Sequence, residues 1–227
     1  FADPLVPPSF DWRWQMFRSF LIGVTLLGLM HSAAVAQTCT GLASYSRGPI
    51  QLAGHGSVVT EVGIHQLGAS LGYGRTNSVF GDVSIANTSA DGVDSFLSYG
   101  ADLGYQQKMG MLQVCPIASY AVSDLPDGFG INNSARTATI GLAIGAAVGP
   151  RQLQIVPTGG IFLEYERVKA EDSFNSSTES DAYAVAHLGM GLVLNSLSIR
   201  PDVAIPLGLE GGDPAVGLTV GFNFGKH

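Results

Sequence analysis

Large apolar residues stand at every second position near the C-terminal end of the chain, namely Val216, Leu218, Val220, Phe222 and Phe224. The positions between them hold Gly, Thr, Gly and Asn. A period of two is typical of a β-strand with one apolar face and one small or polar face. The pattern therefore predicts a strand over residues 216–224, ending shortly before the last residue of the sequence.

A second pattern, Leu-x-(Val/Ile)-x-Pro, recurs at residues 112–116, 153–157 and 197–201. Each copy follows a glycine-rich alternating segment and a short turn, at about 106–110, 149–152 and 195–196 respectively. The repeated unit is therefore a β-hairpin. A more diverged hairpin over about 66–87 turns at 75–78. The three prolines cannot donate a ladder hydrogen bond, so we expect an irregularity near each of them.

The connections on the other side of these hairpins are longer and polar, at residues 88–94, 123–135, 170–180 and 210–214. Short turns that alternate with long loops are typical of a transmembrane antiparallel up-and-down β-barrel, an all-β fold. Such barrels have an even number of strands, and residues 50–60 supply the one that completes the set. We predict ten strands, with eight as the alternative if the first hairpin is irregular.

The alternation also assigns the two faces of each strand. In the strand that begins at Leu197, Arg200 and Asp202 share one face, and leucine and isoleucine share the other. An arginine placed at the lipid midplane costs about 2–4 kcal/mol, so the apolar face points outward and the charged face points into the lumen. The same phase places Tyr73, Tyr99, Tyr105, Tyr120 and Tyr165 outside, with most near strand ends as an aromatic girdle requires.

Candidate chemistry is confined to the lumen-facing positions. Asp82, Asp102, Arg200 and Asp202 lie at similar heights above their turns, so we expect a lumen charge network. It either satisfies interior charges structurally or forms the selectivity ring of a small pore. Glu164 and Glu166 lie higher, and His187 faces inward without a sequence-adjacent Ser, Asp or Glu. We therefore predict no catalytic residue, no metal site and no cofactor.

Composition agrees with a membrane barrel. Only 13% of residues are charged and there are 30 glycines, whereas a soluble domain carries about 25% charged residues. The formal net charge of −7 argues against nucleic acid as a partner.

The N-terminal part of the sequence has the features of an export signal. We interpret residues 1–15 as a non-native upstream extension and residues 16–36 as a signal peptide with Arg18, an apolar core and an Ala-x-Ala site. Such a signal implies the Sec route through the periplasm. Residues 37–49 are predicted as an N-terminal periplasmic segment and 50–227 as the barrel. Export into an oxidising compartment predicts a disulfide between Cys39 and Cys115, with two free buried thiols as the alternative.

The export signal, the hairpin repeat and the terminal Val-Gly-Phe-Asn-Phe together resemble the small bacterial outer-membrane β-barrel families of about eight to ten strands. The resemblance implies location in the outer membrane of a Gram-negative bacterium, contact with outer-membrane lipid and delivery by the barrel-assembly machinery. It also implies that Leu218, Val220, Phe222 and Phe224 form the C-terminal assembly signal. We expect a monomer.

These families share a fold and a location but not one activity. The sequence predicts a non-enzymatic, porin-like barrel with a narrow or filled lumen, serving a structural or interaction role or weak diffusion of small solutes. Its interaction surface would be the loops at 123–135 and 170–180. The alternative is a barrel enzyme that acts on lipid or peptide at the outer rim.

Overall fold

The computed structural model describes residues 38–59, 63–90, 93–128, 131–171, 176–208 and 212–225. The predicted upstream extension and signal peptide, residues 1–36, lie outside these described residues. No helix among the described residues is long and apolar enough to cross a membrane.

Two short 3-10 helices, η1 (Thr38–Thr40) and η2 (Tyr45–Arg47), precede a sheet of antiparallel strands. The first strands are β1 (Ile50–Val59), β2 (Ile64–Gly74), β3 (Val79–Ala90), β4 (Val93–Tyr105) and β5 (Gln107–Met109). The remaining strands are β6 (Leu112–Gly128), β7 (Ile131–Ala146), β8 (Leu153–Glu171), β9 (Ser176–Leu194), β10 (Leu197–Leu207) and β11 (Ala215–Phe224).

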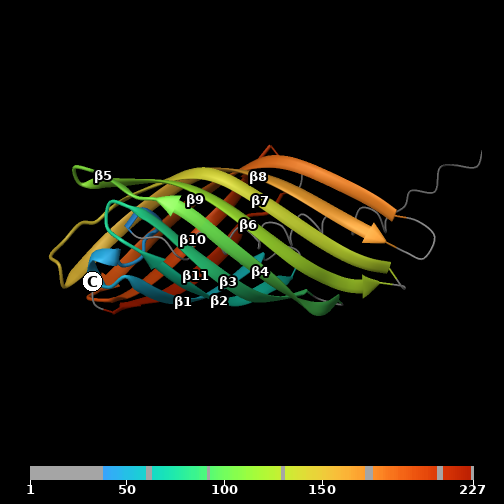
Figure 1. Ribbon diagram of the computed structural model, residues 1–227, viewed down its shortest axis with the longest axis horizontal. Helices are drawn as coiled ribbons and strands as arrows, with labels where there is room; N and C mark the ends of the chain where they lie inside the picture. The colour runs from blue at the N-terminus through green and yellow to red at the C-terminus, as the bar shows by residue number, and fades with distance from the viewer. Residues whose placement is uncertain are drawn as a thin grey trace, which may run out of the picture.

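The sheet closes on itself into a barrel (Figure 1). The first strand pairs with the last, with Ile50 opposite Phe224. Strands β4 and β5 both pair with β6 and are separated only by Gln106, so they form one interrupted strand of the wall. The barrel therefore has ten strands, and the predicted fold is confirmed. The weakly patterned segment after Ile50 is the strand that completes the even count.

The side chains alternate between the two sides of the wall as predicted. In β11 every second residue is buried, and the four residues of the proposed assembly signal, Leu218, Val220, Phe222 and Phe224, point outward. The predicted girdle tyrosines are exposed on the same outer surface. Exposed leucine, isoleucine or valine side chains from every wall strand except β5 lie between them, and β5 adds Met109. A continuous apolar band around a closed barrel is the lipid-facing surface of a membrane protein, because soluble monomers do not expose patches of this extent.

The repeated prolines coincide with breaks in the ladder at all three places, each on one side of the strand. Pro116 lies opposite the gap between β4 and β5. The β9–β10 ladder is interrupted at Arg200 and Pro201. At Pro157 the pairing with β9 runs through, but the β7–β8 ladder ends at Thr158 and resumes only as a single bridge between Val148 and Ile155. The predicted irregularity is therefore confirmed near each proline.

The predicted long loops at 123–135 and 170–180 are wrong in their extent. β6 continues to Gly128 and β7 already starts at Ile131. Likewise, β8 continues to Glu171 and β9 already starts at Ser176. These strands run past the other strands at the end away from the short turns (Figure 1). Beyond the membrane both strand faces meet water, so the apolar–polar alternation that predicts a strand fades while the strand itself continues.

Candidate functional site

The segment Thr38–Pro49, which we call the plug, lies inside the barrel at the end that carries the short turns. Its residues Leu42, Ala43 and Tyr45 are fully buried although they belong to no strand. Helix η1 contacts β6, β7 and β8, and η2 contacts β11. The sequence predicted an N-terminal periplasmic segment here. In the structure this segment lies inside the lumen.

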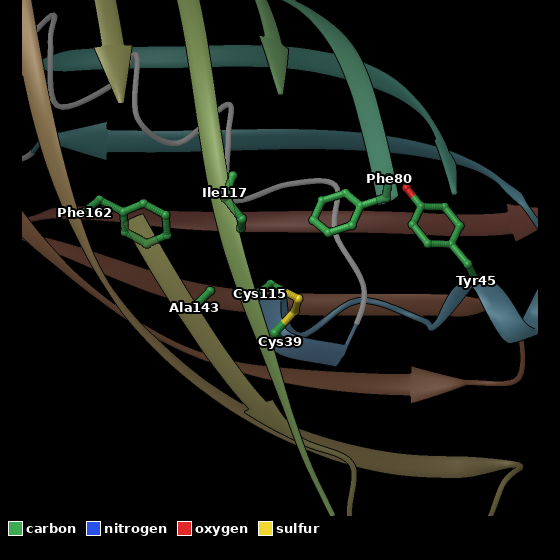
Figure 2. Close-up of a cluster of buried hydrophobic side chains, with 7 residues drawn as sticks. All are labelled: Cys39, Tyr45, Phe80, Cys115, Ile117, Ala143 and Phe162. Carbon is green, nitrogen blue, oxygen red and sulfur yellow. A yellow bond between two sulfur atoms is a disulfide. The ribbon is translucent and has the colours of Figure 1, made fainter. Parts of the chain in front are cut away.

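A disulfide joins the plug to the barrel wall. Cys39 in η1 is bonded to Cys115 in β6, across a sequence separation of 76 residues. Both cysteines are buried, and the bridge lies inside the ring of strands beside Ile117 and Ala143 (Figure 2). The predicted pairing is confirmed. Its consequence is that the plug is covalently held in the lumen.

Hydrogen bonds connect the plug to the seam where the barrel closes. The Gln51 side chain in β1 donates through Nε2 to the Ala43 carbonyl (3.3 Å) and to Asn223 Oδ1 in β11 (2.6 Å). Asn223 in turn donates through Nδ2 to the Gly48 carbonyl (3.2 Å). Gln51 and Asn223 stand on the first and last strands, so these contacts hold the plug and the closing seam together.

A second polar contact holds the plug at its mouth. Arg47 donates through Nη2 to Gln154 Oε1 in β8 at 2.6 Å. Partial burial lowers the pKa of the Arg47 guanidinium, and repulsion from the positive charge of Arg151 lowers it further. At the inner side of the plug, burial raises the pKa of the Tyr45 phenol well above its usual value, and Asp82 adds to this effect. The Tyr45 ring lies 6.3 Å from the ring of Phe80 in β3, measured between centroids (Figure 2).

The plug approaches the wall most closely where two glycines meet. Gly41 has a φ of +79°, which side chains rarely adopt. Its backbone carbonyl lies where a Cβ on Gly191 in β9 would stand, so no side chain fits at Gly191 while the plug is in place. Val193, the next inward residue of β9, shows that this face of the strand accepts a larger side chain elsewhere. Glycine at residue 191 is therefore a requirement of the plug and not of the strand.

This contact gives a first prediction. The variant Gly191→Ala should lose roughly 1–3 kcal/mol of unfolding free energy, because overpacking must displace the plug backbone. Gly159→Ala is the matched control, since a Cβ there meets atoms only at ordinary contact distance. Urea unfolding in detergent micelles measures both. Equal midpoints for the two variants would contradict the close approach.

Two of the predicted lumen charges form an ion pair beneath the plug. Arg200 and Asp202 in β10 lie 3.1 Å apart between Nη2 and Oδ1, and both side chains are almost wholly buried. Arg200 also donates through Nη1 to the carbonyl of Thr40 in the plug. The cation predicted for a charge network therefore also anchors the plug, a partner that strand periodicity does not reveal.

The other two predicted charges belong to a different part of the wall. Asp82 in β3 stands directly opposite Asp102 in β4. Successive cross-strand partners continue this polar row around the inner wall through Ser119, Thr139, Glu164 and Tyr183. The structure thus places the predicted network residues as two pairs, one at the plug and one in a polar row on the opposite strands.

An apolar cluster lies above the polar row, toward the end with the extended strands. It consists of Phe96, Leu125, Ala135 and Val168, from β4, β6, β7 and β8. All four side chains are buried. The lumen is therefore filled by the plug at one end, narrowed by apolar side chains toward the other, and polar between them.

His187 is the inward histidine singled out by the sequence. It lines a cavity of about 20 Å³ together with Arg200, Asp202 and the plug residues Cys39 and Thr40. Its ring lies 5.1 Å from that of Phe162, edge to face. A space of this size holds about one water molecule. It is too small for a substrate, and the plug lies over it.

Two further residues whose side chains could serve as a nucleophile or a base, Ser70 and His65, do not line the cavity of His187. Ser70 in β2 is buried beside Ser84 in β3, whereas His65 is exposed on the outside of β2. Among the residues that the structure describes, no three His, Cys, Asp or Glu side chains gather so as to hold a metal ion. The polar side chains described above hold the plug in place, and the buried apolar side chains fill the space inside the barrel.

No protein-family model matches the sequence, and no curated protein matches it. Solved structures do match the fold. The N-terminal β-barrel domain of OprF from Pseudomonas aeruginosa is 20% identical, with 77% of this chain and 96% of that chain covered and a TM-score of 0.34. Ail, the attachment invasion locus protein of Yersinia pestis, is 9% identical over 77% and 96%, with a TM-score of 0.38. The β domain of the Bordetella autotransporter BrkA is 10% identical over 77% and 98%, with a TM-score of 0.46.

Proposed function

We propose that the chain is an integral β-barrel protein of the bacterial outer membrane whose lumen is closed, and that it serves a structural or interaction role in the envelope. The observation that carries this proposal is the plug. Residues Thr38–Pro49 occupy the lumen and are held by a disulfide, by the seam hydrogen bonds and by Arg200. This covalently attached chain occupies the space through which a solute would have to pass.

The outer surface supports the membrane part of the proposal. On β8 the outward side chains are apolar from Leu153 to Tyr165 and charged from Arg167 onward. That apolar length is a little more than the roughly 9–11 residues that a tilted strand needs to cross the bilayer. The short turns and both ends of the barrel chain lie on the side that is periplasmic in such proteins. Delivery by the barrel-assembly machinery and a monomeric state belong to the same proposal.

Solute uptake by proteoliposomes tests the closed lumen. We expect vesicles that contain the refolded full chain to swell in isotonic arabinose no faster than empty vesicles. Before reconstitution, a gel checks that the chain has folded, because a folded barrel migrates faster when unboiled than when boiled. Swelling that rises with the amount of folded protein would overturn the closed lumen and favour weak solute diffusion. Absence of heat-modifiable migration would count against the membrane barrel itself.

A further inference from the structure

A hollow of about 550 Å³ lies on the outer face of β7, β8 and β9. Its outward-facing lining consists of Ala138, Ile140, Leu163, Tyr165, Ala182 and Ala184. The three alanines leave the space, because the outward side chains beside them on β7 and β8 are larger, namely Ile140, Leu163 and Tyr165. The volume is within the range of about 300–1,000 Å³ that small-molecule sites occupy. Its lining is apolar, so it suits a hydrocarbon chain and not a polar solute.

Two arginines stand directly beyond the hollow. Arg136 in β7 and Arg167 in β8 are cross-strand partners. Each lies two residues closer to the extended-strand end than Ala138 and Tyr165, respectively, and on the same face. Both are exposed. Like charges directly opposite each other destabilise a sheet, so this pair calls for an anion between them. The structure records no ion pair for either arginine with a carboxylate of the described residues.

The charges around the pair leave it basic. Lys169 lies two residues beyond Arg167 on the same outward face of β8. On the neighbouring strand β6, the acidic residue on this face is Asp124. It lies opposite Ser134, two residues closer to the extended-strand end than the level of Arg136. On the other side, β9 presents Ser180 opposite Arg167. In a chain with 11 Lys and Arg against 18 Asp and Glu, a basic group at this place is a local exception.

The height of the site places it at a membrane interface. On β7, β8 and β9 alike, the outward residues change from apolar to polar at the same row, between Tyr165 and Arg167 on β8. Tyrosine is typical of the level of lipid headgroups. The arginines therefore stand at headgroup level and the hollow lies in the acyl region beneath them.

We propose that this face of the barrel binds one phosphorylated, acylated lipid of the leaflet at the extended-strand end. Arg136 and Arg167 hold its phosphate, because the guanidinium fork forms paired hydrogen bonds with phosphate oxygens. One acyl chain occupies the hollow over the alanines. The proposal rests on the membrane placement given above and adds to it a ligand class and a site.

Native mass spectrometry of the folded chain, released from detergent micelles, tests the site with dioleoyl phosphatidic acid as the probe. We expect the parent to retain bound phosphatidic acid and to bind dioleoylglycerol at least tenfold more weakly, since the diglyceride lacks the phosphate. The double variant Arg136→Gln/Arg167→Gln should bind phosphatidic acid about tenfold or more weakly, because each cation near the surface contributes to binding. Arg75→Gln/Arg151→Gln removes the same charge from exposed residues at the short-turn end and should bind like the parent.

A second variant separates the acyl hollow from the charge. Ala138→Leu fills the hollow while leaving both arginines, and it should also weaken phosphatidic acid binding several-fold. Equal binding by Arg136→Gln/Arg167→Gln and the parent would overturn the proposal, as would displacement of the lipid by millimolar inorganic phosphate. Heat-modifiable migration is recorded for every variant. A variant that migrates normally but no longer binds lipid is a folded barrel with a damaged lipid site. A parent that migrates normally but binds no phosphatidic acid overturns the lipid site and leaves the membrane barrel intact.

Discussion

Removing the disulfide should lower the unfolding free energy of the barrel by about 4.5 kcal/mol, the value that loop-closure entropy assigns to a loop of this length. The loop spans 76 residues, from Cys39 to Cys115, and contains the first four strands of the wall. The variant Cys39→Ser/Cys115→Ser keeps the side-chain size and removes the bond. Urea titration in detergent micelles, followed by gel migration and by far-UV circular dichroism, measures the change.

Two features of the site make the disulfide effect large. The bridge fixes the plug, so its loss also weakens the seam contacts at Gln51 and Asn223. Both cysteines are buried, so the serine hydroxyls lose water without an assured partner. The parent unfolded and refolded with a thiol reductant is the control, and it should match the double variant. A difference from the oxidised parent below about 1 kcal/mol would show that the bond does not hold the plug in place.

The membrane-spanning wall could be predicted from the sequence because lipid imposes a strict rule on it. Each strand meets lipid on one side and the lumen on the other, so apolar and small residues alternate, as from Val216 to Phe224. This alternation gave the faces, the closing strand and the strand count. It also placed Arg200 and Asp202 inside, where the structure has them.

The extended ends of β6 to β9 escaped prediction for the same physical reason. In the stretch Ser176–Tyr183 of β9, the residues from Ser177 to Ala182 are exposed whichever way they point. Backbone hydrogen bonds to β8 hold this stretch as a strand. Backbone pairing leaves no periodic trace in the side chains, so the sequence there is typical of a loop.

The plug could not be predicted from periodicity because it belongs to no repeating element. Residues Thr38–Pro49 make their contacts one at a time, with Cys115, Arg200, Gln51 and Gln154. One sequence feature did point to it. A cysteine before the first strand paired with one in the wall requires the N-terminal segment to reach the barrel interior or its rim, because disulfide Cα atoms lie only 6.2 Å apart here.

The partners of the lumen charges illustrate the same limit. The alternation along the strand shows that Arg200 faces inward, but it does not show that the Thr40 carbonyl accepts a hydrogen bond from it. Likewise Gly191 reads as one more small lumen residue, although its size is set by Gly41 of the plug. Contacts across a lumen depend on the shear of the barrel and on what fills it, and neither is encoded in a single strand.

Single-channel recording in a planar bilayer tests the central claim, that the N-terminal segment closes the lumen. The two proteins to compare are the full chain and a chain that lacks residues 38–48 and carries Cys115→Ser, so that no free thiol remains. Removing this segment takes Leu42, Ala43 and Tyr45 out of the lumen while leaving all the wall strands. We expect the full chain to show no discrete current steps and the shortened chain to show steps of one size. Steps of equal size from both proteins, or silence from both with a folded barrel on the gel, would contradict the claim.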